Sequence, residues 1–116
     1  MNKKIFICED NIHVLNAIMD VLSVTGAELI AELDSTRALE RMLTIRPDVL
    51  IWDIEMPIVS GSELIRLIRK SEILSNVFVL GISASHNGKE ASMLAGANAF
   101  IEKPFDICDF MAALPF

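Results

Sequence analysis

Short apolar segments alternate with helix-like segments along the whole chain, and this alternation restricts its fold more than any other feature. Lys4 to Cys8, Val49 to Trp52 and Val77 to Ile82 are largely apolar runs rich in Ile, Val and Phe. Parallel strands that helices cover on both faces have this composition. Glu28 to Leu33 is more mixed and is typical of an edge strand, and a last strand is predicted near Ala99 to Glu102.

The segments between these strands have the periodicity of amphipathic helices. From Ile12 to Thr25, polar residues recur three and four positions apart, and Gly26 can end the helix. Ser35 can cap a second helix, which must stop before Pro47 because the residue preceding a proline avoids helical geometry. Four of the five predicted helices span residues 12 to 25, 35 to about 45, 89 to 95, and 106 to about 114, and the third of the five lies between the second and the 89 to 95 helix.

The third helix has the clearest start signal in the chain. Ser60 and Glu63 form a capping box ahead of an apolar run. The basic side chains of Arg66, Arg69 and Lys70 are predicted to face outward from this helix.

Five strands alternating with five helices predict an α/β fold, a doubly wound parallel sheet with right-handed crossovers. No linker, repeat or low-complexity segment interrupts the pattern, so we expect one domain over residues 1–116. Ligands of such folds bind beyond the carboxyl ends of the strands. The residues at those ends are therefore the candidates for function.

Charged and hydroxyl side chains occupy these ends. Glu9 and Asp10 follow the first strand, Asp53 the third, Ser83 the fourth and Lys103 the fifth. Two carboxylates 4 Å apart repel each other by about 4 kcal/mol at an effective dielectric constant of 20. Three carboxylates and one ammonium leave two negative charges, which a divalent cation can balance. Mg²⁺ fits best, because it needs only a few carboxylates besides waters and phosphate oxygens.

The chain also resembles the receiver domain of two-component response regulators. The resemblance covers essentially its whole length and rests on four motifs in the family's order and spacing, namely ICEDN, RPDVLIWDIEMPIVSG, GISA and AGANAFIEKPF. It implies a flavodoxin-like (βα)5 fold with strand order 2-1-3-4-5. It also implies a phosphoacceptor switch in a two-component phosphorelay.

The resemblance assigns a role to each site residue. Asp53 looks like the phosphoacceptor, whose carboxylate becomes an acyl phosphate. Asp10 looks like the magnesium holder, with Glu9 behind it and with Asp53 and the backbone carbonyl of Glu55 as further ligands. The side chain of Glu55, two residues past the acceptor, departs from the commonest family pattern and adds negative charge beside the site.

Three further positions match the family's switch. Lys103 is expected to pair with a phosphoryl oxygen, and Ser83 to donate a hydrogen bond to another. Phe100 matches the aromatic residue that changes rotamer during switching, and the bond before Pro104 is expected to be cis. Ser85 occupies the second position that in the family tunes hydrolysis of the acyl phosphate.

The implied partners are a sensor histidine kinase or phosphotransfer protein as donor, and a downstream effector protein or domain as target. Phosphorylation is expected to change the surface around the fourth helix and fifth strand. The protein is then no enzyme in the ordinary sense, since it catalyses only its own phosphorylation and slow dephosphorylation. The chain is either a single-domain receiver or part of a longer protein, and we expect a monomer or weak dimer.

Other interpretations of the same residues remain. Asp10 or Asn11 can simply cap the following helix. An enzyme of the haloacid-dehalogenase type also uses an Asp nucleophile with magnesium, but it places that residue after its first strand and usually adds a cap over the substrate. A receiver-like module that binds proteins without phosphorylation is the main alternative function.

Composition narrows the compartment and the partners. The net charge of −6 opposes binding to nucleic acid phosphates. The apolar runs are far shorter than the roughly 18 residues of a membrane span, and no secretory signal is recognisable, so we expect a cytoplasmic protein that does not enter membranes. Cys8 and Cys108 match no disulfide or metal-binding spacing and are both expected to be buried thiols.

Overall fold

The computed structural model describes residues 3–55, 61–84 and 86–116. Its five strands form one parallel sheet in the order β2-β1-β3-β4-β5, which confirms the predicted doubly wound, flavodoxin-like fold. The strands are β1 (Lys4–Cys8), β2 (Glu28–Glu32), β3 (Val49–Asp53), β4 (Phe78–Ser83) and β5 (Ala99–Glu102).

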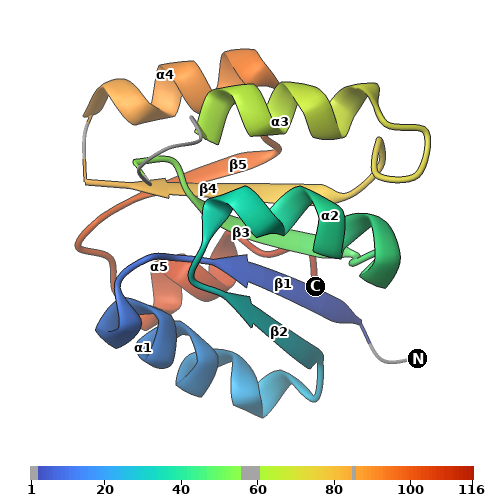
Figure 1. Ribbon diagram of the computed structural model, residues 1–116. Helices are drawn as coiled ribbons and strands as arrows, with labels where there is room; N and C mark the ends of the chain where they lie inside the picture. The colour runs from blue at the N-terminus through green and yellow to red at the C-terminus, as the bar shows by residue number, and fades with distance from the viewer. Residues whose placement is uncertain (1–2, 56–60, 85) are drawn as a thin grey trace.

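Helices cover both faces of this sheet. Figure 1 shows α2, α3 and α4 on one face and α1 and α5 on the other. The helices are α1 (Ile12–Leu22), which continues as a short 3-10 turn η1 (Ser23–Thr25), α2 (Ser35–Ile45), α3 (Gly61–Lys70), α4 (His86–Ala95) and α5 (Ile107–Ala112).

The sheet separates two apolar cores, because successive side chains of a strand point to opposite faces. Phe6, Leu50 and Trp52 pack with the α2–α4 side, whereas Ile7 and Ile51 pack with α1 and α5. All five are completely buried. The middle parts of the strands are thus apolar on both faces, and the charged residues of β1 and β2 stand at the strand ends.

Helix boundaries differ from the sequence prediction in four places, one of which is α5, which covers Ile107–Ala112 and not residues 106 to about 114. Asp34, not Ser35, caps α2, because its side chain accepts hydrogen bonds from the backbone N and the hydroxyl of Thr36 at 2.9 and 2.6 Å. Helix α1 is shorter, and Gly26 with φ of 76° ends the 3-10 turn that follows it. Helix α4 begins three residues before the predicted Lys89. The predicted cap Ser60 and the predicted tuning residue Ser85 lie outside the described residues.

Arg69 does not face outward as predicted. It lies half-buried at the end of α3, and its guanidinium donates to the backbone carbonyls of Gly96, Ser75 and Val77 at 2.9, 2.9 and 2.7 Å, and to Oδ1 of Asn98 at 2.6 Å. Ser75 and Val77 lie just before β4, and Gly96 and Asn98 lie between the end of α4 and the start of β5. Arg69 therefore ties α3, α4 and the amino ends of two strands together.

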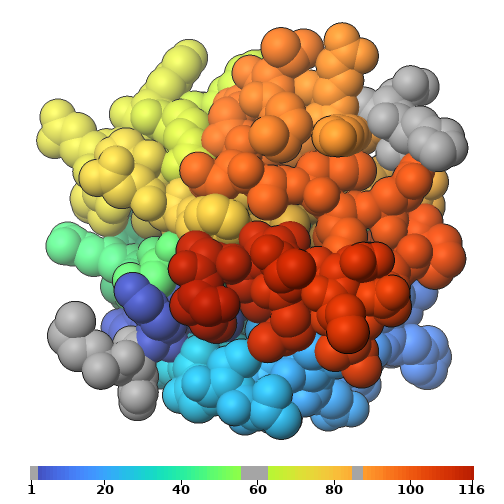
Figure 2. Space-filling model, turned by 180° about the vertical axis from the view of Figure 1, so that it is seen from behind, coloured from blue at the N-terminus to red at the C-terminus, as the bar shows by residue number. Residues whose placement is uncertain are grey.

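The two cysteines also differ from each other. Cys8 is buried in β1, but Cys108 is exposed on α5, so the prediction of two buried thiols was wrong for Cys108. Helix α5 is short and lies on the surface between α1 (blue) and the α4 region (orange), as the red segment of Figure 2 shows. None of the helices in the described residues has the length and apolar character to cross a membrane.

Candidate functional site

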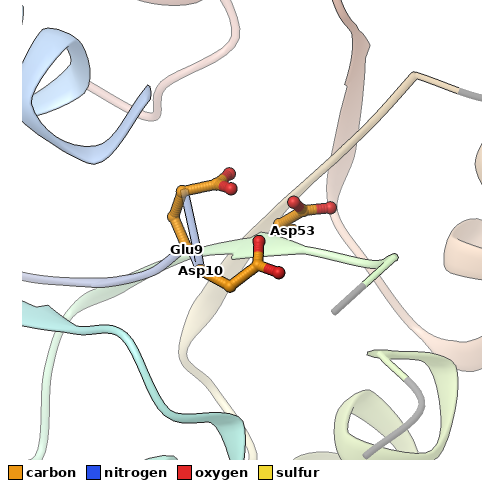
Figure 3. Close-up of side chains that lie close together, drawn as sticks. All are labelled: Glu9, Asp10 and Asp53. Carbon is orange, nitrogen blue, oxygen red and sulfur yellow. The ribbon is translucent and has the colours of Figure 1, made fainter. Parts of the chain in front are cut away.

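Three carboxylates meet at the carboxyl ends of β1 and β3. These strands are paired neighbours, with Cys8 opposite Trp52, so the residues that follow them are brought side by side. Oxygens of Glu9, Asp10 and Asp53 all lie within 4.8 Å of one another, and Figure 3 shows the three side chains gathered in one place. Glu9 and Asp53 are buried, whereas Asp10 is exposed.

The start of α1 decides between two interpretations of Asp10. Asn11 is the cap, because its Oδ1 accepts hydrogen bonds from the backbone N of His13 at 2.9 Å and of Val14 at 3.2 Å. Asp10 therefore does not cap this helix. Its carboxylate instead belongs to the acidic cluster.

Lys103 supplies the positive charge of the site. Its Nζ lies 3.1 Å from Oε2 of Glu9 and 3.1 Å from Oδ2 of Asp53, and its side chain is 22% exposed. Its backbone N donates to the carbonyl of Ser83 at 2.8 Å, which fixes the start of the lysine loop beside β4. Burial lowers the pKa of Lys103, but the hydrogen bonds and charges of the two carboxylates outweigh burial and raise the pKa overall.

Glu9 is a buried carboxyl group whose pKa is raised. Burial, reinforced by the neighbouring Asp53, raises the pKa of Glu9 to about 7. Hydrogen bonds from the backbone N of Asn11, at 3.2 Å, and from Lys103 oppose this rise. One lysine is thus too little positive charge for the buried acids around it.

The turn after β3 holds the second oxygen of the predicted phosphoacceptor. The backbone N of Glu55 donates to Oδ1 of Asp53 at 3.0 Å, so both oxygens of this carboxylate have partners. The side chain of Glu55 reaches β4, where its Oε1 accepts a short hydrogen bond from the hydroxyl of Ser83. Glu55 was expected beside the site from its position in the sequence, but this bond was not expected, because the two residues are 28 positions apart.

Ser83 and Phe100, the predicted switch pair, converge on the start of α4. Ser83 is completely buried and Phe100 is half-buried. A Cβ added to Gly88 would lie 2.7 Å from the Ser83 hydroxyl and 3.5 Å from the Phe100 ring. Only glycine fits there without a shift, so α4 packs directly on both residues. The bond between Lys103 and Pro104 is cis, as the resemblance implies.

The cluster has the donors that a hard divalent cation needs. Mg²⁺ prefers carboxylate oxygens. Two of the three clustered carboxylates are buried, and within the described residues the ammonium of Lys103 pairs with Glu9 and Asp53. The excess negative charge and the raised pKa of Glu9 both favour a cation at this place. The residues present therefore fit the magnesium that the sequence implied.

The chain is similar to known proteins over nearly its whole length. A family model described as "Response regulator receiver domain" matches residues 5–115. The polar-differentiation response regulator DivK from Brucella anthropi is 28% identical over 116 residues, which cover 98% of this chain and 94% of DivK. The transcriptional regulatory protein PrrA from Mycobacterium leprae is also 28% identical, over 94% of this chain. That match covers 47% of PrrA, so the chain spans about half of its length.

Solved structures share the fold. The chemotaxis response regulator CheY4 of Vibrio cholerae has a TM-score of 0.87 at 22% identity, covering 98% of this chain and 100% of CheY4. The receiver domain of the sensor histidine kinase PA1611 from Pseudomonas aeruginosa also has a TM-score of 0.87, at 24% identity, covering 97% of this chain and 93% of that one. That structure was solved with a magnesium ion coordinated in its active-site cleft.

Proposed function

The chain belongs to the response regulator receiver domain family, and from this premise we propose that it is a switch phosphorylated on Asp53 by a histidine kinase or a phosphotransfer protein. One observation carries the proposal. Lys103 lies 3.1 Å from Asp53 and from Glu9, beside the three clustered carboxylates. An acceptor carboxylate, a cation for the transferred group and a set of metal ligands are thus in one place.

The proposed reaction moves one phosphoryl group. A carboxylate oxygen of Asp53 attacks the phosphorus atom of a phosphohistidine, so that a P–O bond forms and the P–N bond breaks. The histidine nitrogen leaves with the electron pair of the broken bond and takes up a proton. The product is an acyl phosphate on Asp53. Such transfers depend mainly on positioning and on neutralisation of charge, which Lys103 supplies by pairing with a phosphoryl oxygen.

Glu9, Asp10, Asp53 and the backbone carbonyl of Glu55 are the residues that we assign to Mg²⁺. A bound Mg²⁺ neutralises charge on the phosphoryl oxygens and orients the donor. Asp10, the exposed member of the cluster, faces solvent and can keep part of a hydrated ion's shell. Buried Glu9 holds the ammonium of Lys103 and its charge in place.

The output follows from the residues that contact α4. After transfer, the hydroxyl of Ser83 donates a hydrogen bond to a phosphoryl oxygen and Phe100 changes its rotamer. Both lie against Gly88, so the surface around α4 and β5 changes. This surface then controls a downstream effector protein or an attached effector domain. The protein turns over no separate substrate and loses its phosphoryl group by slow self-catalysed hydrolysis in the cytoplasm.

The protein that carries the phosphohistidine must dock beside Asp53. An apolar cavity of about 690 Å³ opens beside Lys103, between α1 and the start of α5, and is lined among others by Ala17, Ile18, Phe105 and Phe110. An apolar surface of the donor protein would fit this cavity, because burying apolar surface of both proteins is favourable. Docking there would bring the phosphohistidine to the lysine side of the cluster.

Intact-mass spectrometry tests the proposal. We expect the protein, incubated with Mg²⁺ and acetyl phosphate, to gain a single phosphoryl adduct, and the Asp53→Asn variant to gain none. Omitting Mg²⁺ should also prevent the adduct. Labelling of the Asn variant would move the acceptor elsewhere. No adduct on the unaltered protein would favour the alternative, a receiver-like module that binds its partners without phosphorylation.

A further inference from the structure

The hydroxyl of Ser83 already has an acceptor before any phosphoryl group is present. It is completely buried at the end of β4 and donates to Oε1 of Glu55, which lies in the exposed turn after β3. A second contact fixes this turn against β4, because the backbone N of Ile54 donates to the carbonyl of Ile82 at 2.9 Å. The Glu55 side chain is thus held beside Ser83 by the backbone.

We infer that the Glu55 carboxylate is a positioning residue that holds the Ser83 hydroxyl in the resting protein. A serine hydroxyl has only one proton to donate. It therefore cannot bind Glu55 and a phosphoryl oxygen at once. Switching then requires an exchange of acceptors, from Glu55 to the phosphoryl group. This inference rests on the proposed phosphorylation of Asp53.

Electrostatics gives the exchange a direction. A phosphoryl group carries up to two negative charges at neutral pH. The carboxylate of Asp53 accepts a hydrogen bond from the backbone N of Glu55. A phosphoryl group on Asp53 would therefore lie near the negatively charged side chain of Glu55 and repel it. The exchange reaches α4 because Gly88 packs against the Ser83 hydroxyl. Glu55 thus sets how readily phosphorylation is transmitted to that helix.

The first experiment uses the unphosphorylated, metal-free protein and so does not depend on the proposed function. The amide resonance of Gly88 is compared in the unaltered protein, Glu55→Ala, Ser83→Ala and the double variant. We expect Glu55→Ala to shift this resonance when Ser83 is present and to leave it unchanged in the Ser83→Ala background. Glu55→Gln, which keeps an acceptor oxygen, should resemble the unaltered protein. Equal shifts in both backgrounds would overturn the inference.

The second experiment measures phosphorylation rates with acetyl phosphate and Mg²⁺. Removing the charge of Glu55 should speed reaction with an anionic donor in either background. Loss of the hydrogen bond should add a further increase of about threefold to tenfold only where Ser83 is present. The same acceleration in both backgrounds means that Glu55 acts through charge alone and contradicts the inference. A complete lack of labelling would instead refute the proposed function, and the Gly88 resonance would still decide the role of Glu55.

Discussion

Two half-buried cations lie at opposite ends of β4 and β5 and have contrasting partners. At the amino ends, Arg69 donates to three backbone carbonyls and one side-chain amide oxygen, all of them neutral. At the carboxyl ends, Lys103 lies between two carboxylates. Burial lowers the pKa of Arg69, whereas the acids raise the pKa of Lys103.

The difference in partners suggests different roles: Arg69 anchors the end of α4, whereas Lys103 has partners that can be exchanged for a metal ion or a phosphoryl group. The four acceptors of the Arg69 guanidinium are neutral, so a metal ion or a phosphoryl group does not compete for them. The planar donors of the guanidinium hold the end of α4 in one arrangement. The carboxylates around Lys103 are ligands that a metal ion or a phosphoryl transfer reaction also needs. We therefore expect α4 to be fixed at its carboxyl end and adjustable at its amino end, where Gly88 contacts Ser83.

The largest expected effect breaks the anchor. Arg69→Ala removes four hydrogen bonds and leaves three part-buried carbonyls without this donor, which should lower the free energy of unfolding by about 3 kcal/mol. Urea denaturation measures this loss. Arg66→Ala, an exposed arginine on the same helix, is the matched control and should change stability by less than about 0.5 kcal/mol. Equal effects of the two variants would refute the anchor.

Removing Lys103 should cause a loss of stability that Mg²⁺ can reverse. Lys103→Ala leaves Glu9 and Asp53 without their counter-charge, and we expect a loss of about 2 kcal/mol in metal-free solution. Saturating Mg²⁺ should restore most of it, because the metal neutralises the same carboxylates. The loss in Arg69→Ala should not respond to Mg²⁺. Thermal denaturation with and without Mg²⁺ separates the two cases.

Lys103→Ala should still accept a phosphoryl group but fail to change the α4 surface, and normal switching in this variant would contradict the role of the lysine.

Two glycines test the two ends of α4 separately. Gly96 has φ of 118°, and a Cβ there would lie 2.9 Å from Cγ of Arg69, so Gly96→Ala should cost about 2 kcal/mol of stability. Gly88→Ala would press on Ser83 and Phe100 instead. It should mainly alter the phosphorylation-induced change at α4, followed by NMR. A larger effect of Gly96→Ala on switching than on stability would reverse the assignment of fixed and adjustable ends.

The smallest expected effect concerns pH and involves only the Lys103 end. The pKa of Glu9 is raised to about 7, so Glu9 is mostly protonated below pH 6 and mostly charged above pH 8. Protons and Mg²⁺ compete for it, and the affinity for Mg²⁺ should fall about tenfold from pH 8 to pH 6. Calorimetric titration measures this change, with Trp52 fluorescence as a second readout. In Glu9→Gln the affinity should be weaker but nearly constant over this range, and a dependence as steep as in the unaltered protein would contradict the assignment to Glu9.

The fold was predictable because its signals are local. β1 is apolar because helices cover both faces of the sheet around it, and β2 is more mixed because it lies at the edge of the sheet. β5 has the predicted bounds. Helix ends were less certain where two good caps are adjacent. Asp34 and Ser35 both suit a cap, and only the bonds to Thr36 show that Asp34 fills this role.

The site was predictable in its membership but not in its bonds. Parallel strands bring their carboxyl ends together, so Glu9, Asp10, Asp53 and Lys103 were expected to meet, and the structure brings them together. The bond of Glu55 to Ser83 and the burial of Arg69 depend on how loops from different strands approach each other. Periodicity placed Arg69 on the polar face of its helix but carries no information about a neighbouring helix that covers it.

The unequal thiols described above make the chain suited to single-molecule and fluorescence work without engineering. Burial and the nearby acids raise the pKa of Cys8, which suppresses its thiolate, whereas Cys108 is exposed. A maleimide dye should therefore attach to α5 alone. With Trp52 as the single natural donor fluorophore, energy transfer to a dye on Cys108 gives a distance between the interior of the sheet and its surface.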